Sequence, residues 1–137
     1  MAAFSGVLRD LRRKLSPERV LAEESELLAY ECDGQTLDKV RPALALFPES
    51  TEEVQEAVRI LSRAGVPFTG RGAGTGLAGG ALAPAGGALI LLTRMNRILE
   101  LDLKSRLARI QAGVVNLRVS KEAFPSGLHY APDPSSQ

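Results

Sequence analysis

The chain has 137 residues, of which 45% are hydrophobic, and its 17 Lys and Arg against 16 Asp and Glu give a formal net charge of +1. This size suits one globular domain or two small lobes, and the near-neutral charge gives no electrostatic basis for binding nucleic acid or an anionic membrane. No apolar run approaches the roughly 20 residues of a membrane span, the N-terminus lacks the apolar core of a secretory signal, and Cys32 is the only cysteine, so no internal disulfide forms. We expect a cytoplasmic protein, with peripheral attachment to the inner face of the membrane as an alternative.

Residues 1–40 are predicted to form an N-terminal helical segment. Ser16 and Pro17 end a first helix and begin another turn, with Ser16 as N-cap and Pro17 at the first helical position. A short helix is expected at 25–30. The first helix carries an apolar stripe at helical spacing, interpreted as core or subunit contact in preference to a membrane-surface helix: Phe4, Val7, Leu8, Leu11 and Leu15.

An α/β unit is predicted next. An apolar run bracketed by prolines indicates a buried strand at 43–47. Ser50 and Glu53 have the spacing of a capping box, with Ser50 as N-cap and Glu53 bonded back to it, so a helix is expected at 51–64. Gly65 lies where a left-handed helix C-cap is expected.

Two further strands are predicted at 66–69 and 88–92. A strand, a helix and a strand in such a short stretch imply a right-handed crossover between parallel strands. The segment after the second strand therefore leaves the carboxyl end of a parallel strand, which is where open α/β sheets bind their ligands. We expect these elements to form a first lobe at 41–94.

The style of the pattern changes after residue 94, where an antiparallel hairpin replaces the parallel unit. Two strands are predicted at 97–103 and 107–112, and Asn116 is expected to cap a helix that ends near Ala123. Apolar residues alternate on one face of each strand: Leu99, Leu101 and Leu103, then Ala108, Ile110 and Ala112. Residues 95–137 are therefore expected to begin a second, antiparallel lobe, and the expected fold class is α+β; the family resemblance described below implies that this lobe is incomplete.

The most informative segment is 71–80, in which five of ten residues are glycine. Glycine permits positive φ and close approach of the backbone to a ligand, and consecutive N–H groups in such a loop form a concave anion site. Arg71 would suit the charge of a phosphate. A flexible linker is disfavoured, because linkers are usually Gly/Ser mixtures without the apolar residues found here.

Two better-known glycine motifs are excluded. Residues 74–79 spell G-x-G-x-x-G, but the Rossmann motif needs a helix that opens at its glycines, and the glycines at 79, 80, 86 and 87 together with Pro84 oppose a helix. A P-loop is absent, because no Gly-Lys-Ser/Thr follows. We therefore expect a phosphate-binding loop without a helix.

Four motifs carry a family resemblance through their order and spacing. They are Pro48-x-Ser50-x-x-Glu53-Val54, the run from Arg71 to Gly80, Gln111-Ala112-Gly113-Val114, and Pro132-Asp133-Pro134-Ser135-Ser136. Together they resemble the FAD-binding domain of the vanillyl-alcohol oxidase/p-cresol methylhydroxylase superfamily. Within it, the chain is most similar to the branch of glycolate oxidase flavoprotein subunits and D-lactate dehydrogenases.

The resemblance implies FAD as the cofactor, with its pyrophosphate held by backbone amides of the glycine loop. The implied cofactor-binding residues are Arg71, Gly72, Ala73, Gly74, Thr75, Gly76, Leu77, Gly79 and Gly80, with Pro132, Asp133 and Ser135 along the flavin. Relatives with covalent flavin have a histidine where Thr75 stands, so FAD is expected to be non-covalent. No metal site is predicted, and His129, the only histidine, is interpreted as structural.

The resemblance also implies oxidation of a small 2-hydroxy acid, glycolate or D-lactate, to the 2-oxo acid, with other oxidase subunits as partners. Members of the family continue into a second glycine-rich segment and a substrate domain, so the catalytic residues are expected beyond Gln137. The chain alone is predicted to be a folded, inactive half-site that binds FAD weakly and tends to self-associate. The alternatives are an FAD enzyme of the UDP-sugar enolpyruvyl reductase type, or a non-catalytic interaction module that uses the stripe at 4–15.

Overall fold

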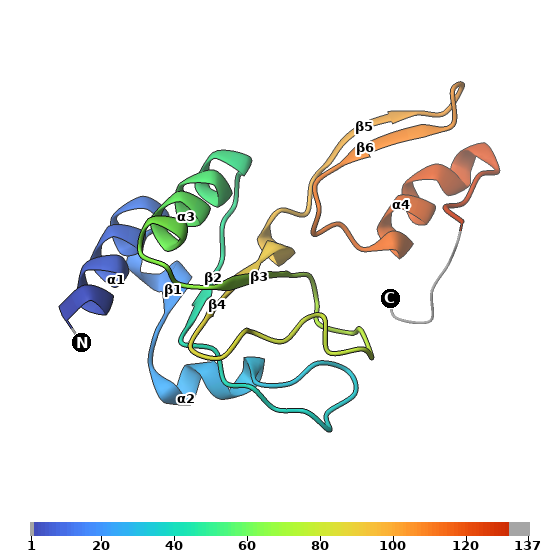
Figure 1. Ribbon diagram of the computed structural model, residues 1–137. Coiled ribbons are helices and arrows are strands. Elements are labelled where there is room, and N and C mark those ends of the chain that lie inside the picture. The colour runs from blue at the N-terminus through green and yellow to red at the C-terminus, as the bar shows by residue number, and fades with distance from the viewer. Residues whose placement is uncertain (1, 132–137) are drawn as a thin grey trace. The chain divides into compact units, whose positions relative to one another are not determined.

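The computed structural model describes residues 2–131. The chain divides into two compact units, Met1–Arg94 and Met95–Gln137, and each is described by itself (Figure 1). Within residues 2–131, no helix combines the length and the apolar character that a membrane crossing requires.

A four-stranded sheet forms the centre of the first unit, with the strand order β1-β2-β4-β3. β2 (Leu44–Leu46) and β3 (Phe68–Arg71) both run parallel to β4 (Ala88–Leu91), which lies between them. The three predicted parallel strands are therefore confirmed, with β3 shifted toward the glycine loop. β1 (Val20–Leu21), antiparallel to β2, was not predicted, because two residues give no periodic signal.

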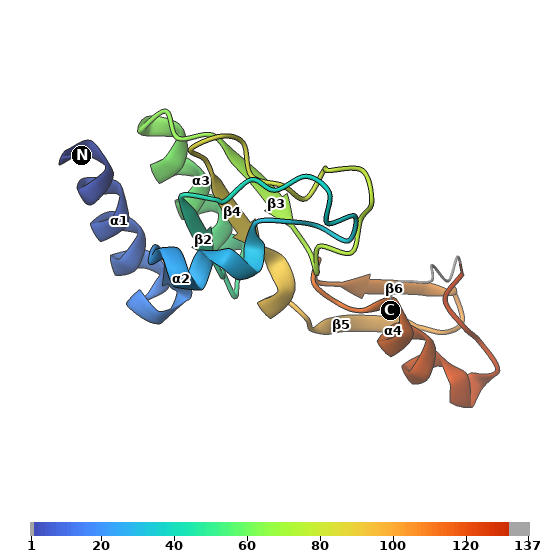
Figure 2. The same cartoon turned by 90° about the horizontal axis from the view of Figure 1, so that it is seen from below.

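Two helices, α1 (Ala2–Leu15) and α3 (Thr51–Arg63), pack side by side on one face of this sheet (Figures 1 and 2). The apolar stripe of α1 is part of the core, because its inward residues share one buried cluster with the strands. That cluster includes Val7, Leu11, Leu15, Leu44, Leu46, Ala57, Leu61, Ala88 and Ile90.

The opposite face is covered by α2 (Glu24–Leu27) and by the chain that follows it. Successive strand residues point to opposite faces of a sheet, so β2 and β4 contribute alternate side chains to a second buried cluster: Leu27, Ala45, Ala83, Leu89 and Leu91. Burial on both faces explains why these strands are continuous apolar runs. The helix predicted at 25–30 is α2 followed by a 3-10 turn, Leu28–Tyr30.

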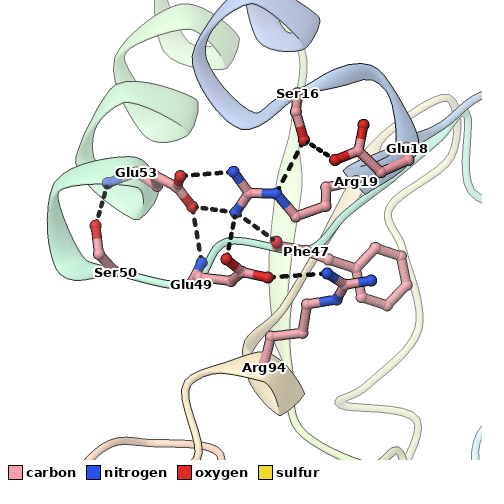
Figure 3. Close-up of polar contacts among 8 residues, drawn as sticks. All are labelled: Ser16, Glu18, Arg19, Phe47, Glu49, Ser50, Glu53 and Arg94. Carbon is pink, nitrogen blue, oxygen red and sulfur yellow. Dashed lines mark hydrogen bonds and ion pairs between the residues drawn. The ribbon is translucent and has the colours of Figure 1, made fainter.

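The N-terminus of α3 shows that only half of the predicted capping box forms. The hydroxyl of Ser50 accepts a hydrogen bond from the Glu53 N–H at 3.2 Å, as predicted. The carboxylate of Glu53 does not return to Ser50, and instead accepts from the Glu49 N–H at 2.8 Å and pairs with Arg19, whose Nη2 lies 2.7 Å from Oε1 (Figure 3). The hydrogen bond from Arg19 holds the pKa of Glu53 below its ordinary value. At the other end, Gly65 has a φ of 66°, which confirms the left-handed C-cap.

Ser16 precedes a short 3-10 helix, Pro17–Arg19, so its position is as predicted. Its predicted capping bond is wrong, because the hydroxyl makes no bond to the helix backbone. It donates to the carboxylate of Glu18 and accepts from Nε of Arg19 at 3.1 Å (Figure 3).

The second unit contains the antiparallel pair β5 (Ile98–Asp102) and β6 (Leu107–Ile110), followed by α4 (Asn116–Ala123). A register irregularity between Ile98 and Glu100 interrupts the regular alternation expected for the first strand. The prediction of Asn116 as N-cap was wrong by one position, because Val115 is the N-cap and makes no side-chain capping bond.

Candidate functional site

The glycine-rich segment lies between β3 and β4 and contains neither helix nor strand at 72–87. It leaves the carboxyl end of β3, as predicted, and the absence of a helix at its glycines excludes the Rossmann motif. Gly74 and Gly79 have φ values of 78° and 74°. Residues with a side chain rarely adopt this left-handed backbone conformation, so these two positions require glycine.

Arg71 is the last residue of β3, and its side chain is buried at 7% exposure. Its Nη1 donates to backbone carbonyls of Cys32 at 2.9 Å, Ala81 at 3.3 Å and Tyr30 at 3.4 Å. The sequence suggested that this guanidinium faces the phosphate. In the structure it bonds instead to one carbonyl near the far end of the loop, that of Ala81, and to two carbonyls in the segment that follows α2.

The guanidinium of Arg71 lies directly beneath the loop backbone at Gly74. A Cβ placed on Gly74 would come within 2.2 Å of Nη2 of Arg71. Glycine at this position therefore serves both the left-handed backbone and the close approach of the guanidinium.

Segment 31–40 lies beside the glycine loop (Figure 2). Asp33 is buried at 6% exposure, and its carboxylate accepts from two backbone N–H groups, those of Gly79 at 2.9 Å and Gln35 at 3.0 Å. The neighbouring Gly34 donates its N–H to the carbonyl of Gly76 at 3.0 Å.

Asp33 and Gly34 were not predicted as site residues; they lie just after the helix expected at 25–30. An Asp-Gly pair is a turn signal, but nothing in the local pattern identifies a partner 46 residues away. Gly34 lies so close to the loop that no side chain fits at this position, because a Cβ on Gly34 would lie 2.8 Å from the carbonyl oxygen of Thr75.

This contact orients the loop amides. The carbonyl oxygens of Thr75 and Gly76 lie against Gly34. In a planar trans peptide the N–H points opposite to the C=O, so the N–H groups of Gly76 and Leu77 point away from segment 31–40. Within the described part of the chain, no backbone N–H at 73–78 has an intramolecular acceptor. We call these N–H groups the amide cradle.

The amide cradle is open to an anionic ligand. Most of its residues are exposed, including Leu77 at 69%, and an added Cβ at Gly72, Gly76 or Gly80 would meet no atom within 4 Å, so a ligand can approach the backbone closely. Successive free N–H groups in a concave loop bind anions. Gly79 differs from the other predicted residues, because its N–H is bonded to Asp33.

Pro132, Asp133 and Ser135 lie outside the described residues. His129 is exposed in the second unit, where it borders an apolar groove of about 510 Å³ between the hairpin and α4. Among residues 2–131, no three His, Cys, Asp or Glu side chains are grouped so that they could hold a metal ion.

Comparisons with known proteins confirm the resemblance. Residues 42–137 match the FAD binding domain family. The chain is 41% identical over 133 residues to glycolate oxidase subunit GlcD of Escherichia coli (strain K12), which covers 97% of this chain and 27% of that protein. It is 36% identical over 126 residues to D-lactate dehydrogenase of Anaerostipes hadrus, which covers 91% of this chain and 26% of that protein.

The fold also matches a solved structure. The crystal structure of p-cresol methylhydroxylase with substrate bound superimposes with a TM-score of 0.83 at 23% identity, over 93% of this chain and 26% of that chain. The α+β fold class predicted from the sequence is confirmed. The chain spans about a quarter of the length of the relatives it matches. With its helix-free glycine loop and the family match over residues 42–137, this chain belongs to the FAD binding domain family, and its cofactor is FAD.

Proposed function

We propose that the amide cradle at 73–78 binds the pyrophosphate of FAD, within an enzyme that oxidises a small 2-hydroxy acid such as glycolate or D-lactate. The observation that supports the binding site is the outward orientation of the Gly76 and Leu77 N–H groups. The carbonyls of the same two peptide groups, those of Thr75 and Gly76, lie against Gly34. The proposed substrate class follows from the names of the relatives.

The described residues would bind and orient the cofactor, and the chemistry would come from the flavin. When bound, the flavin supplies a two-electron acceptor for the hydride on the carbon that bears the hydroxyl. The amide cradle supplies hydrogen bonds to an anion, and Arg71 adds a positive charge beneath Gly74. We assign no catalytic residue within this chain. The name of the GlcD relative designates a subunit, which supports partner subunits for this protein.

A matched pair of substitutions at Leu77 tests the binding site. Leu77→Pro removes the N–H, whereas Leu77→Ala keeps it and removes only an exposed side chain. A hydrogen bond to a charged group contributes about 1.5–3 kcal/mol, so Leu77→Pro should weaken FAD binding about tenfold to a hundredfold. Leu77→Ala should change binding little. Calorimetric titration of FAD into each purified chain gives the affinities, and equal affinities for the two variants would count against the proposed site.

The flavin is proposed to be non-covalent. Threonine has no ring nitrogen that could carry the flavin, so Thr75 cannot form the bond made by a histidine. Acid precipitation of the FAD-loaded chain should therefore release all of the flavin into the supernatant. Flavin absorbance that remains with the precipitated polypeptide would contradict the proposal.

A further inference from the structure

Three residues outside the amide cradle connect segment 30–35 to the loop at its beginning, middle and end. Arg71, where the loop begins, bonds to the carbonyls of Cys32 and Ala81. Gly34 bonds to the carbonyl of Gly76 in the middle, and Asp33 bonds to the N–H of Gly79 near the end. We call Asp33, Gly34 and Arg71 the loop brace.

Two of these bonds pair carbonyls that would otherwise repel an anion. The carbonyls of Gly76 and Ala81 are the negative ends of peptide dipoles, and the loop brace supplies a donor to each of them. Because each peptide is planar and trans, holding the Gly76 carbonyl on the inner side directs the N–H of Leu77 outward. The N–H of Leu82, which follows Ala81, donates instead to the carbonyl of Gly79. The loop brace therefore determines which ends of the peptide dipoles face a ligand.

The charges of the loop brace also bear on an anion. Among residues 2–131, no carboxylate lies within ion-pair distance of the Arg71 guanidinium, whose hydrogen bonds go to neutral carbonyls. Its positive charge thus lies under the loop backbone at Gly74. The negatively charged carboxylate of Asp33 accepts hydrogen bonds from two backbone N–H groups, those of Gln35 and Gly79.

We propose that Asp33, Gly34 and Arg71 are positioning residues for the FAD pyrophosphate: they do not contact it, and they hold the amide cradle in the conformation that binds it. This inference rests on the proposed function of the loop. It assigns Asp33 and Gly34, which lie some 40 residues before the glycine motif, to the cofactor site. It also assigns Arg71 the role of supporting the loop, in place of the contact with the ligand that the sequence predicted.

Two substitutions test the loop brace by different routes. Asp33→Asn keeps the shape of the side chain but replaces one carboxylate oxygen by an NH₂ group, so it cannot accept from both the Gln35 and Gly79 N–H groups. Gly34→Ala places a Cβ 2.8 Å from the carbonyl oxygen of Thr75 and displaces the loop. Gly70→Ala in β3 is the matched control, because its Cβ would meet nothing within 4 Å.

The probes are FAD and inorganic pyrophosphate, titrated into the purified chains by calorimetry. Asp33→Asn and Gly34→Ala should each weaken both probes by the same factor, at least about tenfold, which corresponds to the loss of one charge-assisted hydrogen bond. Gly70→Ala should bind both as the unsubstituted chain does. A common factor for the two probes places the loss at the diphosphate when the variant is fully folded. Partial unfolding would also lower both affinities by one factor, so the fold of each variant is measured separately.

Amide NMR spectra of the same chains provide a readout that needs no ligand. The signals of residues 73–79 should move in Asp33→Asn and Gly34→Ala while those of β2 and β4 stay in place, so a variant that fails to fold is recognised. If the unsubstituted chain binds neither probe, the proposed function itself fails. If it binds both, and the two variants bind them equally well, the loop brace is overturned.

Discussion

Both units of this chain carry regular apolar patterns, continuous in β2 and β4 and alternating in the hairpin, but they bury their apolar side chains very differently. In the first unit, the strands β2 and β4 are buried along their whole length, with helices α1 and α3 over one face and α2 over the other. In the second, the hairpin and α4 leave large apolar side chains exposed: Leu99, Leu103, Leu107, Ile110, Val115, Leu117, Phe124 and Tyr130. An apolar pattern predicts an element, but a core forms only where a second layer covers it.

The difference has a physical cause. A two-stranded hairpin is marginally stable in water, and α4, with eight residues, is shorter than helices that are stable in isolation. In the second unit Leu101 and Ile110 border an open groove. In the first unit the corresponding positions, such as Leu44 and Leu89, have no exposed surface. Stability should therefore be concentrated in residues 1–94.

The largest effect is expected for matched leucine truncations in the two units. Leu46→Ala removes a side chain with 0% exposure from β2, and Leu107→Ala removes one with 56% exposure from β6. Truncation of a fully buried leucine to alanine costs about 2–5 kcal/mol. Leu46→Ala should therefore lower the free energy of unfolding by that amount, and Leu107→Ala by far less. Denaturant titrations followed by circular dichroism measure both, and equal losses would refute the contrast between the units.

A smaller effect is expected for matched ion pairs. Glu53 pairs with Arg19, whose side chain is 11% exposed, whereas Glu100 pairs with Arg109 on the surface of the hairpin, where the side chains are 55% and 65% exposed. Glu53→Gln should cost about 1–2 kcal/mol, between the values for exposed and buried pairs. Glu100→Gln should leave the unfolding free energy unchanged within error. The same titrations measure both substitutions, and a larger loss for Glu100→Gln would contradict this ranking.

The smallest effect concerns pH. The hydrogen bond from Arg19, and to a lesser extent that from the Glu49 N–H, lowers the pKa of folded Glu53 below its ordinary value of 4.5. As the pH falls below 4.5, Glu53 is protonated in the unfolded chain before it is protonated in the folded chain. The stabilisation from Glu53 is therefore complete above pH 4.5, and it decreases until the pH has passed below the pKa of Glu53 in the folded chain. Unfolding titrations from neutral to acid pH should show a smaller decline for Glu53→Gln than for the unsubstituted chain. An identical pH dependence would show that Glu53 contributes nothing to acid lability.

Much of the fold could be predicted because its signals are local. The capping bond of Ser50, the left-handed Gly65 and the antiparallel pairing of the hairpin each depend on a few neighbouring residues. One prediction was wrong because a local partner competed with a distant one. Glu53 has the capping-box spacing, yet its carboxylate pairs with Arg19, 34 residues earlier, because a charged donor binds a carboxylate more strongly than a second backbone N–H does.

For the candidate site, the sequence by itself determined the glycine loop, its position after a parallel strand and its lack of a following helix. These follow from glycine's conformational freedom and from hydrophobic periodicity, which act over short stretches. Only the tertiary structure decided that β4 lies between β2 and β3, that Arg71 bonds to carbonyls, and that Asp33 takes the N–H of Gly79. Such contacts join residues about 40 positions apart, and they form only after the sheet has brought the two segments together.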